Sequence, residues 1–123
     1  MVKFLCIAGS INACAAVALG AFGAHGLKQR LSAEMIAVFQ TGVQYHFYHA
    51  LGLFAVAFVA SRIPQSALIQ WSAWLMLGGI VLFSGSLYGL SLTNIRGLGA
   101  ITPIGGLALL ASWLCLAGAA ANA

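Results

Sequence analysis

The sequence predicts an all-α integral membrane protein: a four-transmembrane-helix bundle with a short interfacial helical segment before the second crossing. Of its 123 residues, 63% are hydrophobic and 5% are charged, and the mean hydropathy is +1.05. A soluble domain carries about a quarter of charged residues, so this composition is that of a chain in lipid. Long apolar runs cross hydrocarbon as helices, because every backbone amide must be paired internally. The expected crossings are residues 4–24, 43–61, 68–90 and 100–121, in a single domain.

The few charged side chains fall at the edges of the apolar runs. Five basic residues against one acidic residue give a formal net charge of +4. A nucleic-acid-binding face needs clusters of basic residues, and the sequence has none. Four crossings place both termini on one side, and the basic residues differ by only one between the two sides, which barely constrains orientation. They are Lys3 and Arg62 on the terminal side, and Lys28, Arg30 and Arg96 on the other, with Glu34 the only acid.

The first apolar run has a signal peptide as its alternative interpretation. Lys3 precedes the run, and Ala21-Phe22-Gly23 resembles a small-residue cleavage site. The run is longer than a usual signal core and no soluble domain follows it. We therefore expect it to remain as a crossing, with its helix stopping at Gly26.

Local signals set the remaining boundaries. Ser32 can cap a helix with Glu34 in its first turn, which the helix dipole favours. That helix would lie at the interface first and then cross, ending before Pro64. Pro103 falls in the first turns of the last run, where proline costs little.

Small residues predict where helices approach each other closely. The glycines of the first run lie at the end of an apolar helix, next to the loop. They do not form a nucleotide-binding fingerprint, because that motif needs a preceding strand. Gly85 and Gly89 form a Gly-x-x-x-Gly motif, the spacing typical of close contact between membrane helices. The expected packing positions are Gly20, Gly23, Gly85, Gly89, Gly105 and Gly106.

A stripe of hydrogen-bonding side chains lies at the centre of the chain. If this stretch is helical, successive residues are about 100° apart around the axis, so that the stripe covers one half of the circumference and the other half is apolar. His46 falls within the apolar half, which we expect to be the lipid-facing one. The stripe would bond to Asn12, Ser84, Ser86, Tyr88 and Thr102 on other helices, so His49→Ala should destabilise the protein more than His46→Ala. This polar intramembrane cluster comprises Gln40, Gln44, Tyr45, Tyr48 and His49.

Four motifs in order, covering nearly the whole chain, resemble one known family. It is the domain-of-unknown-function family four-two-three, the YgdD-like small inner-membrane proteins, with eukaryotic relatives in mitochondria. The resemblance implies a multi-pass protein of the bacterial inner (plasma) membrane and brings no activity, substrate or cofactor. The motifs are Gly23-Ala-His25-Gly26-Leu27, Phe39-Gln40-Thr41 with Tyr45-His46-x-Tyr48-His49-Ala50-Leu51, Ser84-Gly85-Ser86-Leu87-Tyr88, and Thr102-Pro103-Ile104-Gly105-Gly106.

Three function classes remain open from the sequence. The favoured one is a structural or accessory membrane subunit, with the lipid bilayer, a larger membrane complex or a homo-oligomer as partner, and with no cofactor and no enzyme activity. The alternative is a haem, metal or quinone site using His25, His46 and His49, although no recognised ligand spacing is present. A second alternative is an oligomer that transports protons or small solutes. Hydrolysis is disfavoured, because the single acid leaves a catalytic triad hard to assemble.

Overall fold

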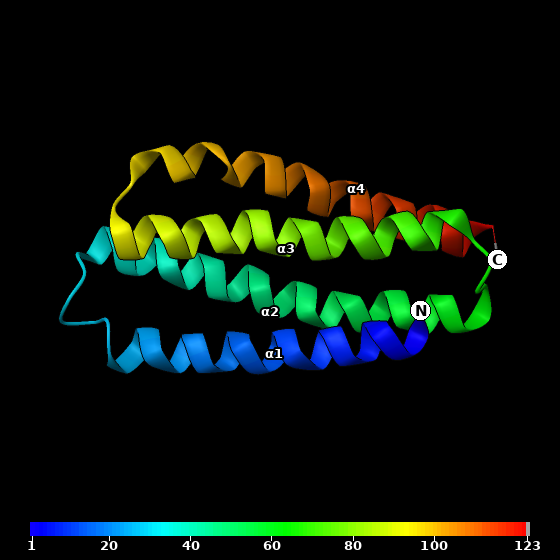
Figure 1. The fold of residues 1–123 in the computed structure, drawn as a ribbon, viewed down its shortest axis with the longest axis horizontal. Coiled ribbons are helices and arrows are strands. Elements are labelled where there is room, and N and C mark those ends of the chain that lie inside the picture. The colour runs from blue at the N-terminus through cyan, green and yellow to red at the C-terminus, as the bar shows by residue number, and fades with distance from the viewer. Residues whose placement is uncertain (123) are drawn as a thin grey trace.

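The computed structural model describes residues 1–122, and they form four long α-helices (Figure 1). All four helical segments are long and apolar enough to span a bilayer. A 3-10 turn, η1, leads into the last helix, and no β-strand occurs within the described residues. The all-helical membrane fold expected from composition is therefore confirmed. The helices are α1 (Val2–His25), α2 (Ala33–Arg62), α3 (Ala67–Thr93) and α4 (Thr102–Ala121), with η1 at Arg96–Ala100.

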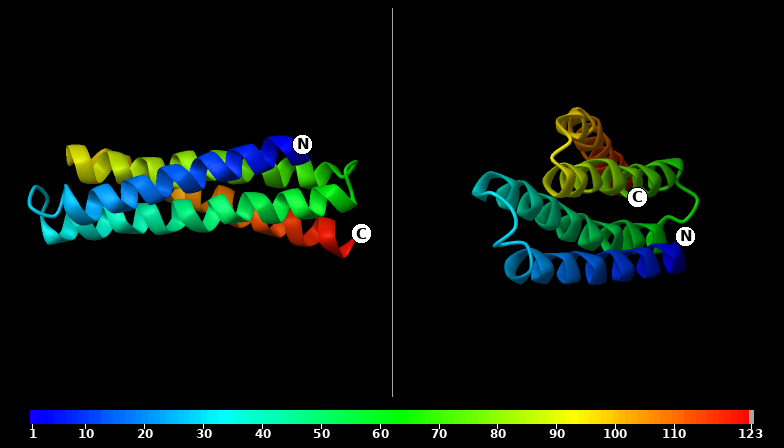
Figure 2. Two further views of the ribbon diagram at one scale, coloured as in Figure 1. Left: turned by 90° about the horizontal axis from the view of Figure 1, so that it is seen from below. Right: turned by 60° about the vertical axis from the view of Figure 1, so that its left-hand side comes forward.

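The helices are packed in chain order, each antiparallel to the next. α1 packs along α2, α2 along α3 and α3 along α4, while α2 contacts α4 only locally. Figures 1 and 2 show α1 and α4 on opposite sides of the central α2–α3 pair, with both termini at one end. This arrangement leaves one long side of α2 uncovered by the other helices.

The helix ends follow the local signals in the sequence. The Met35 amide donates to the Ser32 hydroxyl oxygen at 3.2 Å, so Ser32 is the N-cap of α2 as expected. α2 then continues unbroken to Arg62, so the segment expected at the interface and the crossing are one helix. Asn94 ends α3 in the left-handed conformation (φ 59°), which asparagine tolerates better than most residues.

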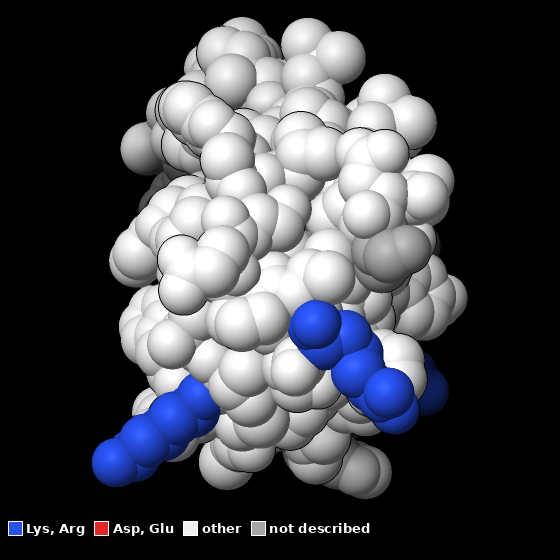
Figure 3. Space-filling model, turned by 90° about the vertical axis from the view of Figure 1, so that its right-hand side faces the viewer, with Lys and Arg blue, Asp and Glu red and all other residues white. Residues whose placement is uncertain are grey.

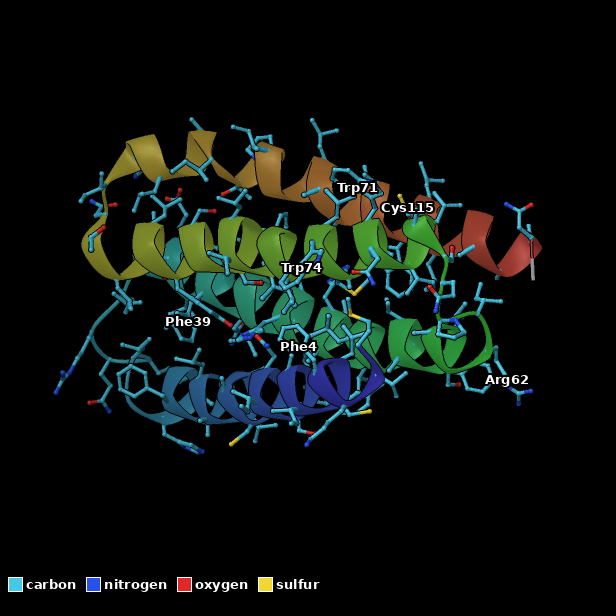
Figure 4. All side chains as sticks on the ribbon, turned by 45° about the vertical axis from the view of Figure 1, so that its right-hand side comes forward. Phe4, Phe39, Arg62, Trp71, Trp74 and Cys115 are labelled. Atoms are coloured by element: carbon cyan, nitrogen blue, oxygen red, sulfur yellow. The ribbon has the colours of Figure 1, made fainter. Side chains whose placement is uncertain are left out.

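The aliphatic core occupies the half of the molecule nearer the termini. Phe4 of α1 and Trp74 of α3 point toward one another at this end, between α1 and α3, with ring centroids 5.5 Å apart (Figure 4). In the other half, buried Phe39 of α2 packs against Tyr88 of α3. The buried core residues include Leu5, Leu53, Val56, Ala57, Ala60, Ile69, Ala73, Met76, Ile80, Leu109, Leu116 and Ala119.

Several of the expected glycines do lie where helices come close. A Cβ atom added at Gly23 would lie 2.7 Å from the Phe39 ring, and one at Gly20 would lie 3.2 Å from Val43. A Cβ atom at Gly105 would collide with the backbone of Phe83, so α3 and α4 touch at main-chain distance here. A Cβ atom added at Gly89 would lie close to Leu98. One added at Gly106 would have more room, at 3.7 Å from Phe83.

The structure corrects the expectation for Gly85. Gly85 is exposed, and an added Cβ would have nothing within 4 Å. The close contact between α3 and α4 instead uses Gly79, which faces Leu109, together with Gly105. The Gly-x-x-x-Gly spacing was misleading, because the side of α3 that carries Gly85 is turned away from its neighbours.

The charged residues lie at the two ends of the molecule. The end that carries both termini shows basic side chains and no acidic one (Figure 3). At the opposite end, Arg96 lies 3.5 Å from Glu34, and both side chains are more than two-thirds exposed. Such an exposed ion pair contributes little to stability.

Gly105→Ala and Gly85→Ala form a matched pair for the α3–α4 contact. We expect Gly105→Ala to lower the melting temperature clearly, because the new methyl group meets backbone that cannot move aside; overpacking of this kind costs about 1–3 kcal/mol. Gly85→Ala should leave the melting temperature unchanged or slightly higher, because alanine favours a helix and meets no neighbour. Thermal unfolding of both variants in one detergent checks this, and equal losses would contradict the contact.

Candidate functional site

The candidate site consists of two buried histidines on α2 and the side chains that bond to them. The ionisable side chains of His46 and His49 are each 6% exposed, near the middle of α2. His25, the third histidine, is exposed at the last residue of α1. The structure thus brings two of the three candidate ligands into the interior and leaves the third at one end.

A chain of hydrogen bonds through His46 joins three helices. The Tyr88 hydroxyl lies 2.9 Å from Nδ1 of His46, and Oδ1 of Asn12 lies 2.9 Å from Nε2. The amide nitrogen of Asn12 donates to the Ala8 carbonyl at 2.8 Å, so the Asn12 oxygen must accept. In the neutral ring, Nε2 therefore carries the proton and Nδ1 accepts from Tyr88. All donors point the same way, from α3 through α2 to α1.

His49 connects α2 to α4 with the opposite tautomer. The indole Nε1–H of Trp113 donates to Nε2 of His49 at 3.0 Å, and Nδ1 lies 2.7 Å from the Tyr45 carbonyl oxygen. An indole nitrogen can only donate and a carbonyl oxygen can only accept. The proton of His49 is therefore on Nδ1. Both nitrogens of both buried rings are occupied by partners within the protein.

The structure corrects which side of α2 is buried. His46, expected on a lipid-facing side, is buried between α1 and α3, whereas Tyr45 and Tyr48 are 39% and 54% exposed. Gln40 and Gln44 are exposed as well, so His49 is the only member of the expected polar cluster that is buried. The buried side is the one where Gly42 and its neighbours let helices approach closely. Backbone proximity, rather than side-chain polarity, decided which side faces inward.

The neighbouring polar residues do form bonds between helices, but with other partners than expected. Asn12 and Tyr88 bond to His46. The Ser84 hydroxyl donates to the Gly42 carbonyl oxygen at 2.8 Å, which is backbone rather than the side-chain stripe.

The remaining polar contacts join α3 to α4. The hydroxyl oxygens of Ser86 and Thr102 lie 2.5 Å apart. Ser72 donates to the Ser112 carbonyl at 2.9 Å, and Ser112 donates to the Ser72 carbonyl at 2.6 Å. Sequence reasoning missed this reciprocal serine pair, although two lone serines in long apolar runs were a signal for it.

The geometry offers no preformed ligand set for a metal or a haem. A ligating imidazole must present a free nitrogen lone pair, and the lone pairs of His46 and His49 accept from Tyr88 and Trp113. Within residues 1–122, no three histidine, cysteine or acidic side chains gather closely enough to hold a metal ion. The two rings also face different neighbours, α1 and α3 for His46 and α4 for His49.

Two surface cavities adjoin the histidines. The larger, about 620 Å³, lies between α2, α3 and α4 with an almost wholly apolar lining. The smaller, about 260 Å³, lies beside His46 on the open side of α3 near Gly85. Organic ligand sites combine an apolar wall with a few polar groups aimed at the ligand. Here the ring nitrogens of His49 and Trp113 beside the larger cavity, and those of His46 beside the smaller one, already bond within the protein. The larger cavity is lined by Tyr45, His49, Phe83, Pro103, Gly106, Leu107, Leu109, Leu110 and Trp113.

Removing the His46 ring should destabilise the protein. His46→Ala leaves Tyr88 and Asn12 without their shared partner, and we expect the free energy of unfolding to fall by about 1–3 kcal/mol. Gln40→Ala, on the exposed side of the same helix, is the control and should change it by less than about 0.5 kcal/mol. Thermal unfolding in detergent measures both. Equal melting temperatures for His46→Ala and Gln40→Ala would contradict a structural role for His46. The structure gives no reason to expect a milder effect from substitution of His46 than from substitution of His49.

The two histidines should also differ in tautomer. In ¹⁵N NMR spectra of the imidazole nitrogens, we expect the protonated nitrogen to be Nε2 in His46 and Nδ1 in His49, because their partners impose opposite directions. His49→Gln and His46→Gln variants assign the signals. The same tautomer in both rings would contradict one of the two hydrogen-bond chains.

Comparison with known proteins agrees with this architecture. The family model described as "Protein of unknown function (DUF423)" matches residues 19–106. The UPF0382 membrane protein YwdK of Bacillus subtilis is 55% identical, and the alignment covers 96% of each chain. The UPF0382 membrane protein SSP2132 of Staphylococcus saprophyticus is 48% identical over 93% of each chain. No solved structure matches the chain. The protein is thus a membrane protein that belongs to the uncharacterised DUF423 (UPF0382) family.

Proposed function

We propose that this protein is a structural or accessory subunit of the bacterial inner (plasma) membrane, which acts by binding another membrane protein rather than by catalysis. Its relatives are named membrane proteins and come from bacteria, which supports the location. The proposal rests above all on one observation: every nitrogen of the two buried imidazoles is bonded to a partner within the chain.

The completeness of these bonds argues for a structural role. A histidine that binds a ligand or moves a proton needs a nitrogen that faces the ligand or the pathway. Here each ring holds α2 to its neighbours instead. Interhelical bonds of this kind are worth about 0.5–2 kcal/mol each in membranes and fix the register of the helices.

The position of the single acidic residue supports a role outside catalysis. Glu34 is exposed in the first turn of α2, beside Arg96. His46 lies twelve residues further along the same helix, about 18 Å away at the usual helical rise. A carboxylate at that distance cannot orient either buried histidine as a general base.

The exposed side chains of α2 support partner binding. Gln44 and Tyr48 lie on the outer side of a spanning helix, where lipid offers them no hydrogen bond. A membrane protein that carries such groups on its surface is stabilised when a second protein covers them.

An absorption spectrum of the purified protein in mild detergent, before and after dithionite reduction, tests the proposal against the haem alternative. We expect only tryptophan and tyrosine absorption, because the lone pairs of both buried rings are in use. Extraction with organic solvent and metal analysis of the same sample test for quinones and colourless metals in the same way.

A near-stoichiometric Soret band that shifts on reduction and disappears in His49→Ala would overturn the structural role. The matched variant is His25→Ala, which alters an exposed ring and should leave the spectrum unchanged under either outcome. Stoichiometric quinone or metal, lost in the His46→Ala or His49→Ala variant, would overturn it equally.

A further inference from the structure

The outer side of α2 carries polar side chains within the membrane, where polar groups need hydrogen-bond partners. This side faces away from α3 and carries Gln40, Gln44 and Tyr48, all exposed. None of the side-chain hydrogen bonds within residues 1–122 involves the Gln44 carboxamide. The surface therefore needs a cover that the single chain does not supply.

The contacts between α1 and α2 show how deep this surface lies. Gly9 of α1 faces Phe54 and Ala50, and Gly23 faces Phe39, so the middle of α1 lies beside the part of α2 just before Ala50. Tyr48 is therefore close to the middle of the membrane. Gln44 is one helical turn away, about 6 Å along the axis. The hydrocarbon core extends about 15 Å to either side of its middle, so the Gln44 side chain is too deep to reach water or headgroups.

Exposed and half-buried residues form a continuous seam along α2. They recur at alternating steps of four and three, the spacing at which two helices pack lengthwise at a shallow angle. Phe58 and Leu51, 62% and 50% exposed, continue the seam as large apolar side chains toward the terminal end. The seam consists of Ala37, Thr41, Gln44, Tyr48, Leu51, Ala55 and Phe58.

A shallow groove beside the seam provides room for a second helix. It lies between α1 and α2 and has a volume of about 340 Å³. Small residues of α1 form one wall, while Gln44 and Tyr48 lie on the other. Its lining is Ala16, Val17, Gly20, Ala21, Val43, Gln44, Phe47 and Tyr48.

We infer that the cover is a second copy of this chain, and that two copies pair through the α2 seam about a two-fold axis along the membrane normal. A carboxamide has both a donor and an acceptor, so Gln44 is complementary to itself. A two-fold axis brings each residue near it against its own copy. Gln44 of one protomer then bonds to Gln44 of its partner at equal depth. This inference names a partner for the accessory role proposed above and rests on it.

The same bond selects the parallel arrangement. In an antiparallel pair of α2 helices crossing at the membrane centre, Gln44 of one copy would lie opposite the apolar stretch near Leu53 of the other. Its carboxamide would remain unpaired in hydrocarbon, which is the cost that association has to remove. Only the parallel pair joins polar group to polar group.

Cysteine cross-linking in native membranes tests the pairing. The three native cysteines are first replaced by alanine, and Leu51→Cys is then compared with Leu110→Cys. Each position lies eleven residues before the end of its helix, at the same end of the molecule, and each is well exposed, at 50% and 62%. With a mild oxidant, we expect at least tenfold more disulfide-linked dimer from Leu51→Cys, because Leu110 lies on α4, away from the seam.

The Gln44 side chain is tested in the Leu51→Cys background. Gln44→Leu should reduce cross-linking several-fold, whereas Gln44→Asn, which keeps a self-complementary amide, should retain most of it. The melting temperature of the detergent-solubilised monomer should not fall in Gln44→Leu, because this residue bonds to nothing within its own chain. That measurement separates loss of pairing from loss of folding.

Equal and low cross-linking of Leu51→Cys and Leu110→Cys would overturn the pairing, as would cross-linking that is insensitive to Gln44→Leu. A Leu51→Cys product that contains only a different protein would also overturn self-association, while leaving the accessory role intact. The absorption spectrum described above is an independent test. A bound chromophore would refute the accessory role whatever the cross-linking shows.

Discussion

The requirement that polar groups be paired in hydrocarbon governs this structure, and the hydrogen-bond chain from Tyr88 through His46 to Asn12 meets it at the centre of the molecule. Each member of the chain comes from a different helix, so α1, α2 and α3 can satisfy these groups only in one register. His49 and Trp113 extend the same principle to α4. Because lipid competes for none of these bonds, few of them suffice to specify how the helices are arranged.

Close approach of the backbones makes this network possible. Gly42 lets α3 come near enough to α2 for the Ser84 hydroxyl to reach a backbone carbonyl. Gly105 brings α4 against α3, within reach of the paired contacts of Ser86 and Thr102. The glycines and the hydroxyl side chains thus act together, since a short polar side chain can bridge two helices only when nothing larger separates them.

The packing of the helices in chain order has a further consequence. α1 and α4 lie on opposite sides of the central pair, and α2, although it is the most buried of the four helices, keeps one side open (Figure 2). Gln44 and Tyr48 occupy that open side. The side of α2 that the fold leaves uncovered therefore carries polar side chains, which links the architecture to association with another chain.

The sequence by itself determined the four apolar helices, their antiparallel order and caps such as Ser32, because these depend on composition and on neighbours along the chain. It also identified Asn12, Ser84 and Tyr88 as groups that bond between helices. Only the tertiary structure decided that His46 is buried while Gln44 is exposed, and that Gly85 lies open while Gly105 is in contact. In lipid, both sides of a helix can be apolar, so polarity does not indicate the inner side. The distance at which backbones can approach decides it, and that distance is a property of two helices together.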